Sequence, residues 1–489
     1  MRTVGSLALQ ESQSVCPLVV DLDGTVIRSN MLFEALCRLV KDNPGALCLI
    51  PYWLYRGKAV LKEQLALRAS VDPGGLPYNH EFVAWLTRQR ARGRTLILCT
   101  GSHETMARAI AAHLGMFDDV MASDGETNLA GRNKAEALVR RFGSAGFDYA
   151  GNSRDDFAVW RSARRAVVVC PSAHVAKRAP SCGEVELVFP SSKRGLEVWR
   201  RLLRVHQWSK NLLLGVPIVA AHRFMEWEAW QGLGLAFLSF SLCASAVYMT
   251  NDLLDLESDR RHPKKCTRPF ACGQVPVWVG FVLVPLLLLS SFALARHVGG
   301  SFVAWLLAYA GLTTAYSWWL KRLLLVDCLT LAMLYTARIV AGGAVIHVHV
   351  SFWLLAFSCF LFLSLAFAKR YAELRLLSQT GKEQAHGRAY WLSDSPLIQM
   401  LGIASGYAAV LVFALYLNSD AVLQLYRAPE YLWGAVPVTV FWISWMWMQA
   451  HRGALQEDAV VFALTDRTSL LAGIALAVVF GLATVGWLA

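Results

Sequence analysis

Three carboxylates recur at helical spacing in a polar segment that follows a long apolar run. Asp252, Asp255 and Asp259 stand at i, i+3 and i+7, so a helix continuing through them places all three on one face. Mg²⁺ characteristically takes one or two protein carboxylates together with phosphate oxygens. Lys264 and Arg268 follow in the same loop and can hold further phosphate charge. The segment predicts a magnesium site for a phosphate ester, and a solvated charged loop is the alternative.

A second pair of carboxylates follows an apolar strand near the N-terminus. The predicted strand 18–20 delivers Asp21 and Asp23 at its carboxyl end, where ligands of open α/β sheets gather. The first carboxylate can attack phosphorus and ligate a metal, while the second protonates the leaving oxygen. A further predicted strand, 95–99, ends in Thr100-Gly101-Ser102, whose hydroxyl and amide groups can hold a phosphoryl oxygen.

The two groups lie in parts of the chain that differ in composition. The 489 residues are 55% hydrophobic with 18 Trp, and the mean hydropathy of +0.40 is too high for a soluble protein. Residues 1–190 have the pattern of a soluble α/β domain, 191–210 that of a basic amphipathic linker helix on the inner leaflet, and 211–489 that of an all-α membrane bundle. Nine spans are predicted, at 211–222, 230–250, 275–295, 302–319, 323–346, 352–368, 397–417, 431–450 and 469–488.

The distribution of charge argues against nucleic acid as a partner, although the net charge is +12. Lys and Arg gather in alternate inter-helix loops, whereas the opposite loops carry only Arg223, Arg296 and Arg427. The eleven cysteines form no C-x-x-C pair, which favours a reducing compartment over zinc or disulfides. The first thirty residues lack the pattern of a signal peptide. We therefore expect the soluble domain and both sites on the cytoplasmic side of the inner membrane.

Further polar residues stand near the predicted cytoplasmic ends of the spans. Ionisable groups within spans are costly and default to a functional role, although Lys369 and Glu373 at i, i+4 can also form a surface ion pair. The candidates are Arg204, Lys210, Asn211, Tyr316, Lys321, Asp327, Arg338, Lys369 and Arg370.

Residues 15–190 resemble the haloacid dehalogenase superfamily of phosphohydrolases, with its four motifs in order. The resemblance implies a Rossmannoid domain with a helical cap formed by the insert at about 30–90. Asn152 stands where the family usually has a metal-binding Asp, so a degenerate domain is the alternative, although the amide carbonyl can still ligate. The resemblance implies Asp21 as nucleophile, Asp23 as acid/base, Thr100 and Lys134 as phosphoryl-binding groups, and Asp21, Asp23, Asn152 and Asp156 around the magnesium.

Residues 195–489 resemble the UbiA superfamily of intramembrane transferases. The similarity rests on the nine predicted spans, the N-D-x-x-D-x-x-x-D run at 251–259, the H-P-x-K-x-x-R-P run at 262–269 and the second Asp-bearing segment around Asp327. It implies a helical bundle whose polar cavity holds Mg²⁺ and a pyrophosphate donor, with Asn251 at the substrate.

Segments 203–211 and 462–467 look most like the decaprenyl-phosphate phosphoribosyltransferase branch of that superfamily. This implies phosphoribosyl pyrophosphate as donor and a polyprenyl phosphate as acceptor, oriented by Arg204 and Lys210, while Lys264, Arg268 and Lys321 neutralise the leaving group. The fused phosphatase would then remove the 5-phosphate from the product. An aromatic prenyltransferase and a transporter or lipid-binding protein are the alternatives, and the oligomeric state is left open.

Overall fold

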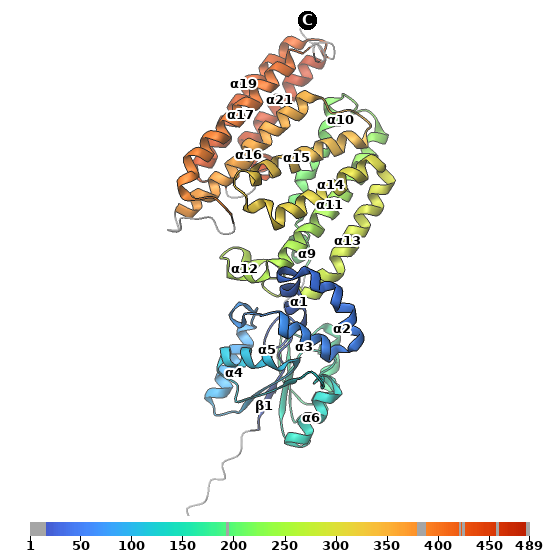
Figure 1. Ribbon diagram of the computed structural model, residues 1–489, viewed down its shortest axis with the longest axis vertical. Coiled ribbons are helices and arrows are strands. Elements are labelled where there is room, and N and C mark those ends of the chain that lie inside the picture. The colour runs from blue at the N-terminus through green and yellow to red at the C-terminus, as the bar shows by residue number, and fades with distance from the viewer. Residues whose placement is uncertain are drawn as a thin grey trace, which may run out of the picture. The chain divides into compact units, whose positions relative to one another are not determined.

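The computed structural model describes residues 16–191, 195–378, 388–419, 422, 426–455 and 459–485 (Figure 1). The chain divides into two compact units. The first unit comprises Met1–Leu202 and Met249–Leu283, and the second comprises Leu203–Tyr248 and Val284–Ala489. The acidic segment predicted to bind magnesium thus belongs to the first unit.

Within the described part of the first unit, six parallel strands form one sheet, in the order β3-β2-β1-β4-β5-β6. Strand β1 lies at its centre, between β2 and β4, so the loops that follow these three strands meet at one edge of the sheet. The strands are β1 Leu18–Val20, β2 Leu96–His103, β3 Asp119–Ser123, β4 Asp148–Gly151, β5 Ala166–Val169 and β6 Val185–Phe189.

Helices cover both faces of this sheet because its strands are apolar on both sides. Leu18 and Val20 pack in one cluster, while Val19 packs in the cluster on the opposite face. The helices and 3-10 turns of residues 1–202 are α1 Met31–Asp42, η1 Pro44–Leu49, α2 Ile50–Arg56, α3 Lys58–Arg68, η2 Pro73–Gly75, α4 His80–Ala91, α5 Glu104–Leu114, α6 Arg132–Phe142, α7 Phe157–Trp160, α8 Ala173–Arg178, η3 Ala179–Ser181 and α9 Leu196–Leu202.

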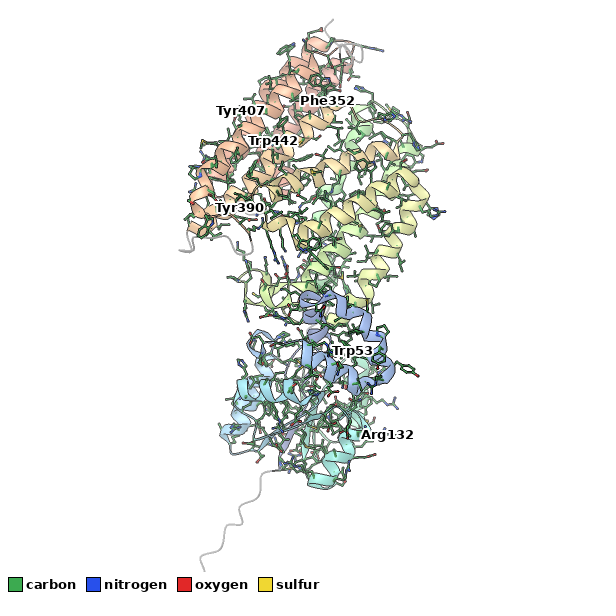
Figure 2. All side chains as sticks on the ribbon, viewed as in Figure 1. Trp53, Arg132, Phe352, Tyr390, Tyr407 and Trp442 are labelled. Carbon is green, nitrogen blue, oxygen red and sulfur yellow. The ribbon has the colours of Figure 1, made fainter. Side chains whose placement is uncertain are left out.

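The predicted cap is smaller than expected. Helices α1, α2 and α3 share a core of their own that includes Leu39, Trp53 and Leu65, and Trp53 is labelled in Figure 2. Helix α4 was predicted as part of the cap, but Phe82 and Leu86 pack into the core of the sheet. The last part of the insert is therefore a helix of the sheet layer, because its buried residues face the strands.

The acidic segment is not the one continuous helix that its spacing predicts. Helix α11 Trp227–Leu254 ends before Asp255, and α12 Leu256–Arg261 begins after it. The 3-10 turn η5 Lys265–Thr267 and the helix α13 Val277–Val298 follow. Asp255 has φ −100° and ψ 13°, outside the helical range, so its side chain leaves the face that Asp252 and Asp259 share.

The second unit is helical and packs through large side chains against small ones. At Gly402, a Cβ atom would lie 2.2 Å from the ring of Trp447, so only glycine permits this approach. The remaining elements are η4 Val205–Gly215, α10 Val216–Ala220, α14 Gly300–Trp318, η6 Leu320–Arg322, α15 Val326–Val345, α16 Phe352–Ser378, η7 Leu392–Asp394, α17 Ser395–Leu417, η8 Pro429–Gly434, α19 Ala435–Arg452, α20 Ala459–Thr465 and α21 Arg467–Val485.

In the described ranges, six helices are long and apolar enough to cross a membrane. They are α11, α13, α15, α16, the stretch Leu392–Leu417 that consists of η7 and α17, and α21. The chain therefore has a polytopic helical membrane part. Nine spans were predicted and are not confirmed, because α10 has only five residues, and α14 and α19, although helical, are not among the six.

The predicted linker helix is divided into two pieces. Residues 192–194, with Lys193 and Arg194, lie outside the described residues. Helix α9 ends at Leu202, and η4 begins at Val205 after Arg204, which has a φ of +51°. A left-handed residue interrupts a helix, so the described basic side chains of 200–210 do not share one continuous helical face.

Candidate active sites

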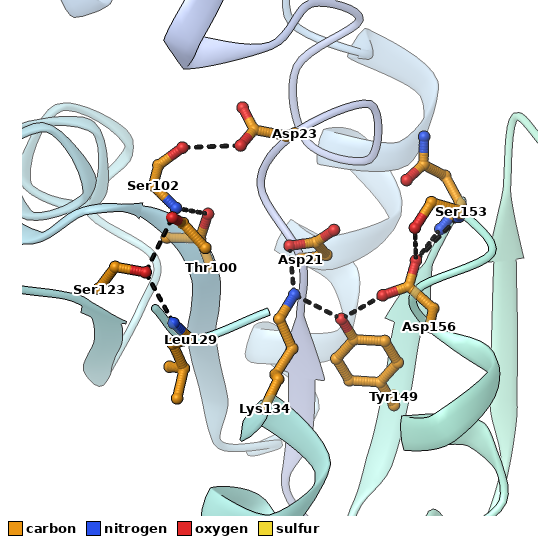
Figure 3. Close-up of polar contacts among 12 residues, drawn as sticks. Asp21, Asp23, Thr100, Ser102, Ser123, Leu129, Lys134, Tyr149, Ser153 and Asp156 are labelled. Carbon is orange, nitrogen blue, oxygen red and sulfur yellow. Dashed lines mark hydrogen bonds and ion pairs between the residues drawn. The ribbon is translucent and has the colours of Figure 1, made fainter. Parts of the chain in front are cut away.

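Four polar side chains form a buried chain beneath the carboxyl ends of β1 and β4 (Figure 3). Lys134, from α6, donates to Asp21 Oδ1 at 2.8 Å and to the Tyr149 hydroxyl at 2.9 Å. Tyr149 in turn donates to Asp156 Oδ1 at 2.8 Å. The structure thus brings the predicted nucleophile and the predicted phosphoryl-binding lysine together, and Tyr149 fixes the lysine from the other side.

Asp23 is held in place by two donors. The backbone N–H of Met31, at the first turn of α1, donates to Oδ1 at 2.7 Å, and the Ser102 hydroxyl donates to Oδ2 at 2.7 Å. Ser102 therefore contacts the predicted acid/base directly. Thr100 is fully buried, and its Oγ1 accepts the Ser102 backbone N–H at 3.0 Å, so its hydroxyl shapes the turn at the end of β2.

Burial controls the acidity of both carboxyls. It raises the pKa of Asp21, although the Lys134 ammonium opposes the rise. It also raises the pKa of Asp23, and the hydrogen bond from Ser102 opposes it in part. The buried carboxyls of Asp21 and Asp23 line the same cavity. Their position favours the binding of a cation, because a cation stabilises their charged forms.

The residues around Asp21 fit a divalent cation. The side-chain oxygen of Asn152 is buried and has no hydrogen-bond partner among the residues that the structure describes. Asn152 lies over Gly24, where a Cβ atom would come within 2.0 Å of Nδ2 and where φ is +77°. A carbonyl oxygen without a partner, beside two carboxylates, is a donor set typical of Mg²⁺.

Asp156 is hydrogen-bonded to the loop that carries Asn152. Its Oδ2 accepts the backbone N–H groups of Asn152 and Ser153 at 2.9 and 2.8 Å and the Ser153 hydroxyl at 3.0 Å. Both of its oxygens are thus occupied by protein donors. Asp156 shapes the loop that presents Asn152, and its role as a metal ligand stays a prediction.

Sequence reasoning missed two residues of this site. Tyr149 lies inside an apolar strand, where its type is usual, so nothing in the sequence marked it. Lys62, on cap helix α3, donates to the carbonyl of Gly101 and to Asn128 Oδ1, and burial lowers its pKa. A lone lysine on an amphipathic helix gives no signal of this position.

The acidic segment forms a second cluster. Arg268 donates from Nη1 to Asp252 Oδ1 at 3.0 Å and also to Asp259, and both carboxylates are buried. Burial raises the pKa of Asp259, and Arg268 opposes the rise. Asp255 instead lies 3.8 Å from Lys41 of the cap. Among the described residues no three His, Cys, Asp or Glu side chains are close enough together to hold a metal ion.

Asp327 lies in a separate network within the second unit. Its Oδ2 is 3.0 Å from Arg370 Nη2 and 3.2 Å from Arg388 Nη1, and Tyr390 donates to Oδ1 at 2.6 Å. Asp327, Arg370 and Tyr390 are fully buried, and Tyr390 is labelled in Figure 2. Arg388 and Tyr390 were not predicted, because they stand in a stretch expected to be a polar loop.

Residues of the segment 203–211 also contact other side chains of the second unit. Asn211 donates to Ser241 Oγ at 3.0 Å and accepts from Arg338 Nε at 2.9 Å. The Lys210 ammonium lies 5.7 Å from the centroid of the Tyr335 ring, and the Arg204 guanidinium carbon lies 5.0 Å from that of Tyr248. Lys264 is exposed, whereas the other predicted binding residues are half-buried, namely Asn251, Tyr316, Lys321 and Lys369.

The sequence matches two family models. One, described as the UbiA prenyltransferase family, matches residues 212–471, which is more than half of the chain. The chain belongs to the UbiA prenyltransferase family. The other model, described as haloacid dehalogenase-like hydrolase, matches residues 18–161. The chain is therefore a UbiA-family membrane enzyme with an N-terminal haloacid dehalogenase-like domain.

Relatives of this UbiA-family chain support the fused architecture. An uncharacterized protein, y4nM, from Sinorhizobium fredii is 36% identical over 96% of this chain and 91% of its own length. The nodulation protein NoeC of Azorhizobium caulinodans is 37% identical over 57% of this chain and 91% of its own length. The decaprenyl-phosphate phosphoribosyltransferase of Mycolicibacterium smegmatis is 30% identical over 55% of this chain and 86% of its own length.

Proposed function

We propose that this UbiA-family enzyme moves 5-phosphoribose from phosphoribosyl pyrophosphate to a polyprenyl phosphate, and that its N-terminal domain then removes the 5-phosphate. The similarity to a relative named decaprenyl-phosphate phosphoribosyltransferase is the single observation that carries the choice of donor and acceptor. The acidic segment supports the general chemistry, since Asp252 and Asp259 already converge on one cation, the Arg268 guanidinium.

In the transfer step, the chain binds the donor pyrophosphate and stabilises its charge as it leaves. Within the first unit, Asp252, Asp255 and Asp259 would hold Mg²⁺, which would supply Lewis-acid stabilisation of that leaving group, with phosphate oxygens completing its ligand set. Asp327 of the second unit is proposed as a separate metal ligand. Lys264 and Arg268 add positive charge beside the same group. Lys321, in the second unit, is proposed as a further phosphate-binding residue. The acceptor phosphate is already anionic, so it attacks the anomeric carbon without a strong general base, and the carbon–pyrophosphate bond breaks.

Arg204 and Lys210 are proposed to orient the acceptor phosphate. Each lies beside an aromatic ring, at 5.0 and 5.7 Å from the ring centroid, and attraction to the face of that ring gives each cation a defined place. The positive charges of Arg204 and Lys210 favour the binding of an anionic lipid acceptor over that of a neutral aromatic acceptor.

In the hydrolytic step, a carboxylate oxygen of Asp21 bonds to phosphorus while the ester oxygen leaves with a proton from Asp23. Asp23 then takes a proton from water, which attacks the aspartyl phosphate and releases inorganic phosphate. Lys134 lies 2.8 Å from Asp21 and holds the phosphoryl oxygens. Mg²⁺ bound by Asp21, Asp23 and Asn152 would lower the charge repulsion between nucleophile and phosphate.

A prenyltransferase that moves a polyprenyl group from its diphosphate to an aromatic acceptor is the second candidate. The family description favours it, and the acidic segment serves both chemistries equally. The proposal also keeps the nine-span arrangement, the divisions near residues 190 and 210, and a cytoplasmic-membrane location with both sites on the cytoplasmic side.

The test uses the full chain purified in detergent with Mg²⁺, polyprenyl phosphate and radiolabelled phosphoribosyl pyrophosphate. We expect label in the organic phase, carried on a lipid that lacks the 5-phosphate. The Asp21→Asn variant should accumulate the phosphorylated lipid, and release of phosphate at an unchanged rate would contradict the proposed second step. Absence of label in the lipid, with an acceptor preparation that a known transferase uses, would replace the first step by prenyl transfer.

A further inference from the structure

One cavity of about 660 Å³ surrounds Asp21 and Asp23 in the first unit. Its polar floor carries Asp21, Asp23 and Lys134, and the cap contributes an apolar side that includes Leu32 and Phe33. Part of the lining comes from outside residues 1–202. It comes from the segment that follows the acidic cluster, Gly273 to Trp278, which we call the 273–278 wall.

Arg260 fixes the start of this wall against the cap. Its guanidinium donates to both carboxylate oxygens of Glu34, at 2.7 and 3.0 Å, to the Gly75 carbonyl at 3.2 Å and to the Ala271 carbonyl at 3.1 Å. The side chains of Arg260 and Glu34 are 9% and 5% exposed. A buried guanidinium with four acceptors has a single geometry, so Ala271 and the residues after it are held against the cap.

The close approach at Gly273 continues this contact. Gly273 has a φ of +70°, and a Cβ atom there would lie 2.6 Å from the Cβ of Arg28. Both the conformation and the lack of space require glycine at this position. The wall is therefore packed directly on the loop that follows Asp23.

The outer part of the wall is apolar and belongs to a helix of membrane-spanning character. Pro276, Val277 and Trp278 line the cavity, and Val277 is the first residue of α13, one of the helices long and apolar enough to cross a membrane. Trp278 is 47% exposed. Tryptophan at the end of such a helix is typical of the membrane–water interface.

These positions set the chemistry of a ligand that fills the cavity. Its phosphate must reach Asp21 and Lys134, whereas its other end meets Pro276, Val277 and Trp278 beside the start of α13. A free sugar phosphate satisfies the polar floor and leaves the apolar wall without a partner. An ester on a polyprenyl lipid covers both.

We propose that the 273–278 wall determines the specificity of the phosphatase site, and that it selects phosphate monoesters carried on a polyprenyl lipid over free sugar phosphates. This inference rests on the proposed hydrolytic function of the N-terminal domain. It adds that a part of the chain outside that domain decides what the domain accepts.

The test compares Trp278→Ala with Trp278→Phe in the full-length, detergent-purified protein. Phosphate release is measured with polyprenyl-phosphoryl-ribose 5-phosphate and with ribose 5-phosphate. We expect Trp278→Ala to lower kcat/KM for the lipid ester about tenfold, mainly through KM, and to change that for ribose 5-phosphate less than twofold. Trp278→Phe should restore most of the selectivity. Trp227→Ala, at a position 72% exposed in the second unit, is the matched control and should change neither.

Binding separates this inference from the proposed hydrolysis. In an Asp21→Asn background, which does not turn over, the affinity for the lipid ester should fall about tenfold on adding Trp278→Ala. The unaltered protein could fail to hydrolyse either substrate and still show this loss of affinity. The proposed hydrolysis would then be wrong, whereas the proposed selection of the lipid ester by the 273–278 wall would be supported. If hydrolysis occurs but Trp278→Ala changes kcat/KM for the two substrates equally or not at all, the 273–278 wall does not determine specificity. The proposed hydrolysis is unaffected by that result.

Discussion

Replacement of Arg260 by methionine is expected to release α12 from the cap. The substitution removes a guanidinium that is 9% exposed and leaves the Glu34 carboxylate, at 5% exposure, without its cation. Breaking a buried ion pair in this way costs about 3–5 kcal/mol, and methionine keeps only the unbranched stem of the side chain. Since about 1.4 kcal/mol corresponds to a tenfold change in an equilibrium constant, local opening of α12 should increase roughly 10²- to 4 × 10³-fold.

Hydrogen exchange of the α12 backbone amides, Leu256–Arg261, measures this opening. The matched control is Arg200→Met, because Arg200 pairs with Glu197 at 3.5 Å while both side chains are more than 60% exposed. An exposed pair contributes at most about 1 kcal/mol, and the control should leave exchange in α12 unchanged. In the double variant Arg260→Met with Glu34→Met, most of the protection should return, because well-packed apolar residues replace buried pairs at little cost.

Equal exchange of α12 in Arg260→Met and Arg200→Met would refute this reasoning. It would mean that the Arg260–Glu34 pair does not hold the acidic segment to the cap. Failure of the double variant to recover would assign the effect to the carbonyl contacts of Arg260 with Gly75 and Ala271 instead.

Three further predictions concern the sites. Asn152→Asp should lower the Mg²⁺ concentration needed for half-maximal phosphate release about tenfold, because a carboxylate adds charge at a hard-cation site; an unchanged requirement would place the cation elsewhere. Asp255→Ala should abolish label transfer to lipid while phosphate release from a small ester stays within twofold, and joint loss would indicate misfolding or a shared site. Arg370→Met should cost about 3 kcal/mol, because Asp327 is fully buried; thermal denaturation in detergent should show a lower Tm, and a Tm equal to that of Arg322→Met, at an exposed arginine, would contradict it.

The parts of the fold that were predicted are those encoded locally. An apolar run followed by Asp21 and Asp23 predicted β1 and the edge of the sheet at which these carboxylates lie, because ligand groups of a parallel sheet gather where its strands end. The family resemblance implied Asp21 as nucleophile and Lys134 as a phosphoryl-binding group, and the structure places the Lys134 ammonium 2.8 Å from Asp21 Oδ1.

The parts that were missed depend on contacts between distant residues. Helical spacing of Asp252, Asp255 and Asp259 predicts one face, but contacts of this segment with Lys41 and Glu34 accompany the break at Asp255. Such ties cannot be read from periodicity, because they join residues more than 200 positions apart. Likewise, the burial of Phe82 against the sheet could not be told from burial within the cap, since either neighbour requires the same amphipathic helix.

The contact between Gly24 and Asn152 gives a way to recognise which fused chains keep both activities. Any other residue at position 24 would meet the Asn152 amide at 2.0 Å and would have to adopt a φ of +77°. A single codon change there is therefore expected to disable the phosphatase while the distant transferase sequence stays intact. In a population of related genes, loss of this one glycine would mark lineages in which the hydrolytic step has passed to another protein.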